Sequence, residues 1–79
     1  MRKVPVRDLK KCVGKLAVVT FLDHVKGDSP PVKCRVVGWL RTAKRKYVVL
    51  KWWKAPGRHN QEFASILRNT ILKVKVEGD

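Results

Sequence analysis

At 79 residues the chain is expected to form one small domain, residues 1–79, with no room for a deep catalytic cleft. Lysine and arginine number 19 against 6 aspartate and glutamate, which gives a formal net charge of +13. Self-repulsion of that size indicates an anionic partner such as nucleic acid, an acidic protein or an acidic membrane surface. Hydrophobic residues still make up 44% of the chain and occur in runs, which argues against disorder, so the chain is expected to fold.

The two cysteines, Cys12 and Cys34, lack metal-binding spacing, and no secretory signal accompanies them. We therefore expect both to be small, reduced core residues in a cytoplasmic protein. No apolar run approaches the roughly 20 residues that cross a bilayer, so no membrane partner is expected.

The first segment combines a basic stretch with a short helical pattern. Residues 1–5, MRKVP, end at a proline that cannot extend a helix backward, so they should fray or lie along a neighbouring strand edge. Apolar side chains then recur at helical spacing from Val6 to Val13, and Gly14 stands where a C-terminal cap would. This pattern predicts one short helical turn before the first strand.

Two strands are predicted in the middle of the chain. Residues 15–25, KLAVVTFLDHV, are almost continuously apolar and rich in β-branched side chains, which is typical of a central strand covered on both faces. The sequence KGDSPP then indicates a loop. Over residues 32–41 apolar side chains alternate with cations and Trp39, which predicts a strand with one basic face.

A third strand is predicted over residues 47–53, YVVLKWW. Val48, Leu50 and Trp52 share the face expected to lie in the core, and Trp53 lies on the opposite, exposed face. The two adjacent tryptophans are therefore expected to have different roles.

The last part of the chain allows two interpretations. Alternating apolar residues favour a short strand from Glu62 to Leu67, a tight turn, and a final strand from Ile71 to Val76. The alternative is an amphipathic helix at about residues 60–72, because several apolar residues there also fit a helical period.

A five-residue hairpin loop at residues 42–46 would pair Arg41 with Tyr47 and Trp39 with Val49 on an outward face. That face alternates cations, which neutralise phosphates, with rings, which stack on bases at roughly 1 to 3 kcal/mol each. The pattern predicts noncatalytic nucleic-acid binding of low sequence specificity. The candidate binding residues are Lys33, Arg35, Trp39, Arg41, Lys44, Arg45, Lys46, Tyr47, Lys51, Trp53 and Lys54.

Two other interpretations of these residues remain open. The sequence TAKRK can be a solvated turn, and Arg35 over Trp53 an ordinary structural cation–π contact. Alternatively, an exposed patch of Trp39, Val49 and Trp53 can be covered by a second copy of the chain or by an acidic protein. The chain would then be a protein-interaction or homo-oligomeric assembly module.

No catalytic or metal site is predicted. Asp23 and His24 are adjacent, but the other carboxylates are too scattered to converge on a cation. Cys12, Cys34 and the histidines have none of the spacings of structural zinc sites. We therefore expect no enzyme activity, no metal and no cofactor.

Strands of this length with turns about every ten residues predict an all-β fold, a small barrel of about five strands with a short N-terminal helical turn. The expected barrel is SH3-like or Sm-like. The α+β alternative carries the C-terminal helix at about residues 60–72.

The order of DLKKCVGKLAVVTFLDH, VGWL, YVVL and SILRNTILKVKV resembles that of short uncharacterised bacterial and phage proteins. Those proteins look like SH3-like barrels whose final strand follows a tight turn. The resemblance covers most of the chain but rests on apolar positions and Gly38, so it implies a fold and assigns no functional residue.

Overall fold

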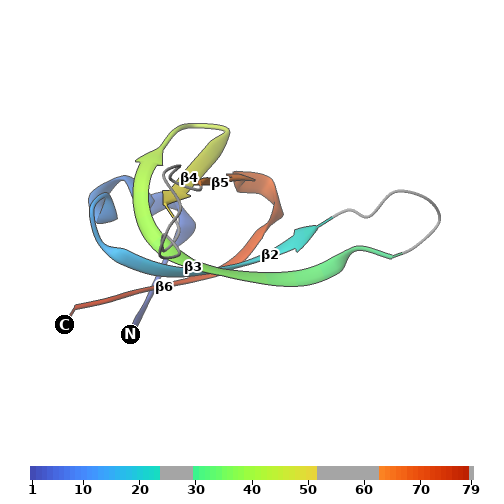
Figure 1. Ribbon diagram of the computed structural model, residues 1–79, viewed down its shortest axis with the longest axis horizontal. Coiled ribbons are helices and arrows are strands. Elements are labelled where there is room, and N and C mark those ends of the chain that lie inside the picture. The colour runs from blue at the N-terminus through green and yellow to red at the C-terminus, as the bar shows by residue number, and fades with distance from the viewer. Residues whose placement is uncertain (24–29, 52–62, 79) are drawn as a thin grey trace, which may run out of the picture.

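The computed structural model describes residues 1–23, 30–51 and 63–78, and these are mainly β (Figure 1). The strands are β1 (Arg2–Val4), β2 (Leu16–Asp23), β3 (Val32–Ala43), β4 (Tyr47–Lys51), β5 (Phe63–Leu67) and β6 (Ile71–Val76). Two 3₁₀ helices, η1 (Val6–Cys12) and η2 (Arg68–Thr70), complete the fold. The predicted mainly-β class is confirmed.

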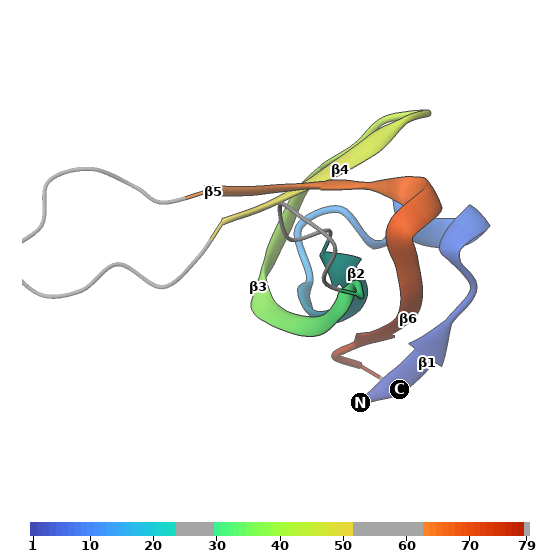
Figure 2. The same ribbon diagram turned by 90° about the vertical axis from the view of Figure 1, so that its right-hand side faces the viewer.

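The six strands form one antiparallel sheet in the order β1-β6-β2-β3-β4-β5. The sheet is not closed, and β1 and β5 are its edge strands. The sheet has one strand more than the predicted five because residues 2–4 pair with β6. These residues were expected either to fray or to lie along a strand edge, and they do the latter. Figure 2 shows β3 curving from its place beside β2 up to the β3–β4 hairpin.

Strand β2 lies inside the sheet, between β6 and β3, as predicted. Ala17 and Val19 are fully buried, and they pair with core positions on both neighbouring strands. Val18 is only half-buried and points to the opposite face. The expectation that β2 is covered on both faces was therefore wrong, because no element packs over this face within the described residues.

The core lies on the inner face of the curved sheet, closed at one end by η1. Leu9 of η1 is fully buried beside the aliphatic side chains of the strands. The largest fully buried side chains are Leu9, Leu40, Leu50, Val19, Val48, Val74 and Val76. Burial of each contributes roughly 1.5 to 3 kcal/mol to folding.

The β3–β4 hairpin pairs differently from the sequence-based register. Trp39 pairs with Lys51 rather than Val49, and Thr42 pairs with Val49. The register shifts between Leu40 and Thr42, so Arg41 is an extra residue in β3, and β3 continues to Ala43. As far as Leu40 the slip is two residues, so the side chains of β3 up to that point keep their predicted faces. Beyond the extra residue the alternation reverses, and Ala43 rather than Thr42 lies opposite the buried Val48.

The C-terminal segment confirms the strand-turn-strand interpretation. Residues 63–67 and 71–76 are the strands β5 and β6, and η2 makes the single turn between them. The Thr70 hydroxyl donates a 2.7 Å hydrogen bond to the Leu67 carbonyl, which closes that turn. The helix alternative was wrong over residues 63–72, where the alternating burial along β5 favours a strand.

The N-terminal helical turn is present as η1, a 3₁₀ helix. It ends just before Gly14, whose φ of 95° lies in the left-handed region that glycine adopts without strain. The Gly14 amide then donates a 2.7 Å hydrogen bond to the Leu40 carbonyl, which ties this turn to β3.

Candidate nucleic-acid interface

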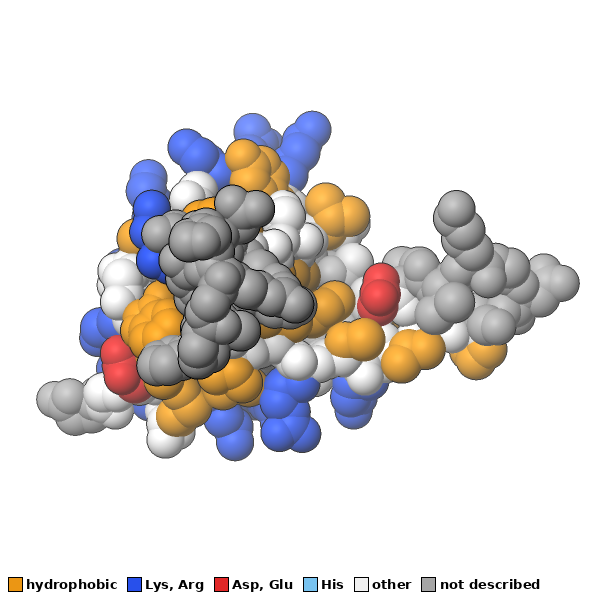
Figure 3. Space-filling model, viewed as in Figure 1, with side chains coloured by type: hydrophobic (Ala, Val, Ile, Leu, Met, Phe, Trp, Pro, Cys, Tyr) orange, Lys and Arg blue, Asp and Glu red, His pale blue; other side chains and the backbone are white. Residues whose placement is uncertain are grey.

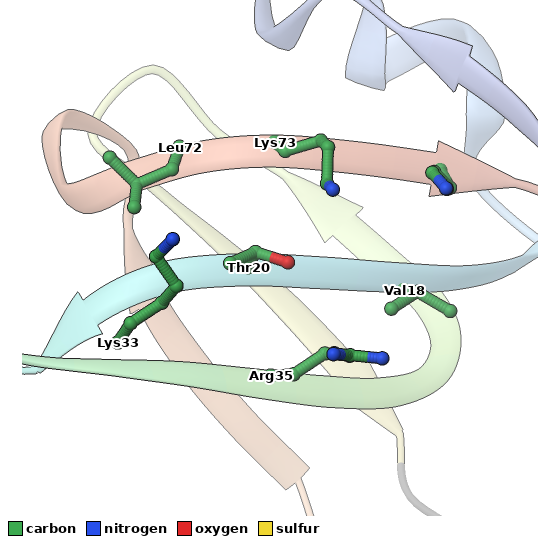
Figure 4. A pocket seen from close by; sticks show the side chains of 7 residues that line it. Val18, Thr20, Lys33, Arg35, Leu72 and Lys73 are labelled. Carbon is green, nitrogen blue, oxygen red and sulfur yellow. The ribbon is translucent and has the colours of Figure 1, made fainter.

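An open groove crosses the outer face of β6, β2 and the first half of β3 (Figure 4). Its volume is about 470 Å³. The residues that line it are Val18, Thr20, Lys33, Arg35, Leu72, Lys73 and Lys75. We call this surface the basic groove, because four of the seven lining residues are cations and none is acidic.

Strand pairing fixes where these cations lie. Thr20 pairs with Arg35 on β3 and with Lys73 on β6, so these three side chains share one face of the sheet. Lys75 lies opposite Val18 on the same face. The cations therefore stand in two rows, one on β3 and one on β6, with β2 as the floor between them.

The floor of the basic groove is small and partly polar. Thr20 is only 9% exposed and Val18 is half-buried. Figure 4 shows the Thr20 hydroxyl on the groove side of β2, with Lys73 above it and Arg35 below. A hydroxyl donates to and accepts from an anion's oxygens without adding charge of its own.

The four groove cations are exposed, and none has a charged partner in the part of the chain that the structure describes. The structure gives the side chains of Lys33, Arg35, Lys73 and Lys75 no hydrogen bond or ion pair with another described residue. Because like charges in two facing rows repel one another, an anion placed between them relieves that repulsion.

A second group of cations occupies the loop between β3 and β4. Lys44, Arg45 and Lys46 are all exposed, and the Lys44 amide donates a 2.8 Å hydrogen bond to the Tyr47 carbonyl across the loop. In Figure 3, Lys and Arg side chains gather above this hairpin and again along the lower edge, beneath β2 and β3. The loop cations and the groove cations are therefore two separate groups, and further exposed cations such as Lys10 and Lys11 lie on η1.

The outer face of β3, β4 and β5 carries the exposed rings. The Arg41 guanidinium carbon lies 5.9 Å from the centre of the Phe63 ring, a cation–π contact across the sheet. Tyr47 is 39% exposed and pairs with Leu67, which is 58% exposed. We call this surface the aromatic face.

The structure divides the predicted binding residues among three places. Lys33 and Arg35 lie in the basic groove, and the three loop cations lie at the hairpin tip. The half-buried Trp39 and Lys51 accompany Arg41 and Tyr47 on the aromatic face. The predictions for Trp52, Trp53 and Lys54 lie outside the described residues.

Sequence reasoning missed three polar residues of the basic groove, and its aliphatic residues Val18 and Leu72 as well. Lys73 and Lys75 were treated as part of the last strand only, and Thr20 was placed in a strand buried on both faces. The alternation in LKVKV did indicate two cations on one side of that strand. What it does not indicate is that β6 lies next to β2, which brings Lys73 within two strands of Arg35.

Cys12 is buried in the core as expected, whereas Cys34 is only half-buried, and both are free thiols. Within residues 1–23, 30–51 and 63–78, His, Cys, Asp and Glu side chains form no group of three that can hold a metal ion. No helix in those ranges has the length and apolar character needed to cross a bilayer.

Comparisons of the chain with protein-family models, with curated proteins and with solved structures found no match. The placement of the cations and rings therefore carries the inference of function.

Proposed function

We propose that the chain is a noncatalytic nucleic-acid-binding protein of the cytoplasm, with an SH3-like small-barrel fold. The observation that carries the proposal is the basic groove, in which cations on β3 and β6 lie on either side of a hydroxyl-bearing floor without a charged partner among the described residues. Nucleic acid is the anion that supplies regularly spaced charges to such rows.

Three features support the SH3-like assignment. The long β3 is shared, pairing with β2 over its first part and with β4 over its last part. A single 3₁₀ turn, η2, separates the last two strands, and the final strand β6 returns to pair with β2. The resemblance of the apolar pattern to short bacterial and phage proteins favours the same fold.

The proposed binding is electrostatic and of low sequence specificity. Lysine and arginine displace counterions from phosphates, which favours binding without reading any base. The described residues contain only 3₁₀ helices of seven and three residues, and neither offers a recognition helix for the major groove. Tyr47 and Arg41 on the aromatic face are proposed as secondary contacts that stack on exposed bases.

The test is a fluorescence anisotropy titration of nuclease-treated protein with labelled oligonucleotides at three salt concentrations. Nucleic-acid binding predicts an affinity that falls steeply as salt rises. Polyglutamate of matched charge is the control ligand, because a merely basic surface binds it equally well. Equal affinity for both polymers, or no oligonucleotide binding at low salt, contradicts the proposal.

A matched pair of variants locates the site. Arg35 and Arg41 are both exposed arginines on β3, but Arg35 lies in the basic groove and Arg41 lies on the aromatic face. Arg35→Ala is expected to weaken binding several-fold more than Arg41→Ala. A larger loss of affinity in Arg41→Ala than in Arg35→Ala would indicate that the phosphates bind at the aromatic face.

The second candidate function is an assembly or protein-interaction module. It is favoured by the aromatic face, where Phe63 and Leu67 of the edge strand β5 and Tyr47 of the neighbouring β4 expose apolar surface. Sedimentation velocity over a range of protein concentrations tests self-association. A dimer that Leu67→Lys dissociates would support this function, and a monomer throughout would leave a different, acidic protein as the partner to seek.

A further inference from the structure

We infer that the basic groove binds the backbone of a nucleic-acid duplex and contacts phosphates of both strands. This inference rests on the proposed function, and it names the form of nucleic acid that the groove takes. The occupant is argued from the spacing of the cations, from the chemistry of the floor and from the absence of rings among the described residues that line the groove.

The first argument is the distance between the two rows of cations. Neighbouring strands lie about 4.8 Å apart, so the β3 row and the β6 row, separated by β2, are about 10 Å apart at the backbone. The minor and major grooves of a duplex are about 6 Å and 12 Å wide. Long, flexible side chains on two such rows therefore reach phosphates on both sides of a duplex groove.

The second argument is the spacing within each row. Lys33 and Arg35 are two residues apart on β3, as are Lys73 and Lys75 on β6. Two residues of strand span about 6.6 Å. Each row therefore presents two separate charges along one direction, which suits successive phosphates of one strand better than a single isolated anion.

The third argument is the lack of aromatic side chains among the described residues that line the groove. Its described lining residues are four cations, Thr20 and two aliphatic side chains, Val18 and Leu72. Sites for single strands add stacking of bases on rings, worth about 1 to 3 kcal/mol per base. A duplex already has its bases stacked inside and offers its phosphates outward, so it needs no ring from the protein.

The floor also fits a backbone rather than a base. Thr20 is nearly buried, with its hydroxyl on the groove side between Arg35 and Lys73 (Figure 4). A hydroxyl in that place donates a hydrogen bond to a phosphate oxygen that the flanking cations attract. The exposed rings, Tyr47 and Phe63, belong to the separate aromatic face.

The test compares an unmodified duplex with duplexes in which uncharged methylphosphonate linkages replace the phosphates of one strand. If both strands are contacted, neutralising either strand lowers the slope of log affinity against log salt to about half its original value. If only one strand is contacted, the protein uses the charged strand and the slope does not change. An unchanged slope overturns the inference.

Two double variants make the test specific to the groove. One removes the β3 row, Lys33→Ala with Arg35→Ala, and the other removes the β6 row, Lys73→Ala with Lys75→Ala. All four side chains are exposed, so both variants should fold. Each is expected to bind the unmodified and the half-neutral duplex with equal salt slopes, because one row remains to hold one strand.

A single-stranded ligand distinguishes failure of the duplex inference from failure of the proposed nucleic-acid binding. It has about 24 nucleotides, so that it carries as many phosphates as a duplex of about 12 base pairs. Tighter binding of this single strand, with quenching of tryptophan fluorescence, overturns the duplex inference and leaves nucleic-acid binding intact. Failure of both ligands to bind at low salt overturns the proposed function itself.

Discussion

The guanidinium Nε of Arg68 donates a 2.7 Å hydrogen bond to the carbonyl oxygen of Lys44, at the base of the basic β3–β4 loop. Its Nη1 donates a second bond, of 2.9 Å, to the Val6 carbonyl at the start of η1. The Arg68 amide donates a third, also 2.9 Å, to the Lys46 carbonyl. Arg68 thus joins η2, the loop and η1, and its charge serves the fold rather than a ligand.

Replacing Arg68 by alanine is expected to destabilise the protein by roughly 1 to 3 kcal/mol, since two carbonyls lose a charged donor. Arg68→Lys keeps the charge but cannot reach both carbonyls with a planar fork, so it should recover only part of the loss. Chemical denaturation followed by circular dichroism measures both. Wild-type stability in Arg68→Ala would show that these hydrogen bonds contribute nothing.

Gly38 is predicted to tolerate no side chain. A Cβ at this position would lie 2.6 Å from the carbonyl oxygen of Lys51 on the neighbouring strand, closer than such atoms approach. Because that atom belongs to the backbone of a paired strand, Gly38→Ala should cost about 1 to 3 kcal/mol or more.

Gly14→Ala is the matched control for that steric effect. Gly14 has a φ of 95° and nothing within 4 Å of its Cβ position, so alanine there suffers backbone strain alone. We expect a loss on the order of 1 kcal/mol. Thermal denaturation compares the two variants, and a Gly38→Ala protein as stable as wild type would contradict the close approach.

Replacing a leucine by alanine is expected to affect stability differently on the two faces of β4 and β5. Leu50 is fully buried, whereas Leu67 is 58% exposed on the aromatic face. Leu50→Ala should cost about 2 to 5 kcal/mol through lost burial and a cavity, and Leu67→Ala should change stability by less than about 0.5 kcal/mol. Urea denaturation at two protein concentrations checks both values and exposes any stabilising self-association through Leu67.

The salt dependence of duplex binding is predicted to follow the number of groove cations. Removing Lys73 and Lys75 together should reduce the slope of log affinity against log salt by nearly 2, about 0.9 for each lost phosphate contact. Removing Lys10 and Lys11 of η1, which are exposed but outside the groove, is the charge-matched control. Equal effects of the two double variants would indicate that net charge alone drives binding.

Local patterns predicted most of the elements but not their arrangement in space. Alternation identified β4 and β6, and the helical spacing before Gly14 identified η1. The hairpin register was wrong because β3 runs to Ala43, which pairs with Val48, so the turn is shorter and lies later in the chain than the predicted loop at residues 42–46. The extra residue at Arg41, which leaves no signal in an alternating pattern, shifts the register again by one residue. A bulge of this kind is set by the twist of the sheet, which depends on long-range packing.

The candidate site shows the same division between local and distant information. Lys33 and Arg35 were predicted from the alternation in β3, which a single strand suffices to define. Lys73 was missed because its closeness to Arg35 comes from the pairing of β6 with β2, about fifty residues apart in the chain. Of the rings predicted to share a surface with these cations, Trp39 and Tyr47 lie instead on the aromatic face, and Trp53 lies outside the described residues.

The most direct measurement follows the amide chemical shifts of isotope-labelled protein as a duplex oligonucleotide is added. The account predicts that the largest changes occur on β2, β6 and the first half of β3, centred on Thr20, Arg35 and Lys73. Changes centred on Tyr47 and Phe63, with the groove residues unmoved, would contradict it and assign the ligand to the aromatic face.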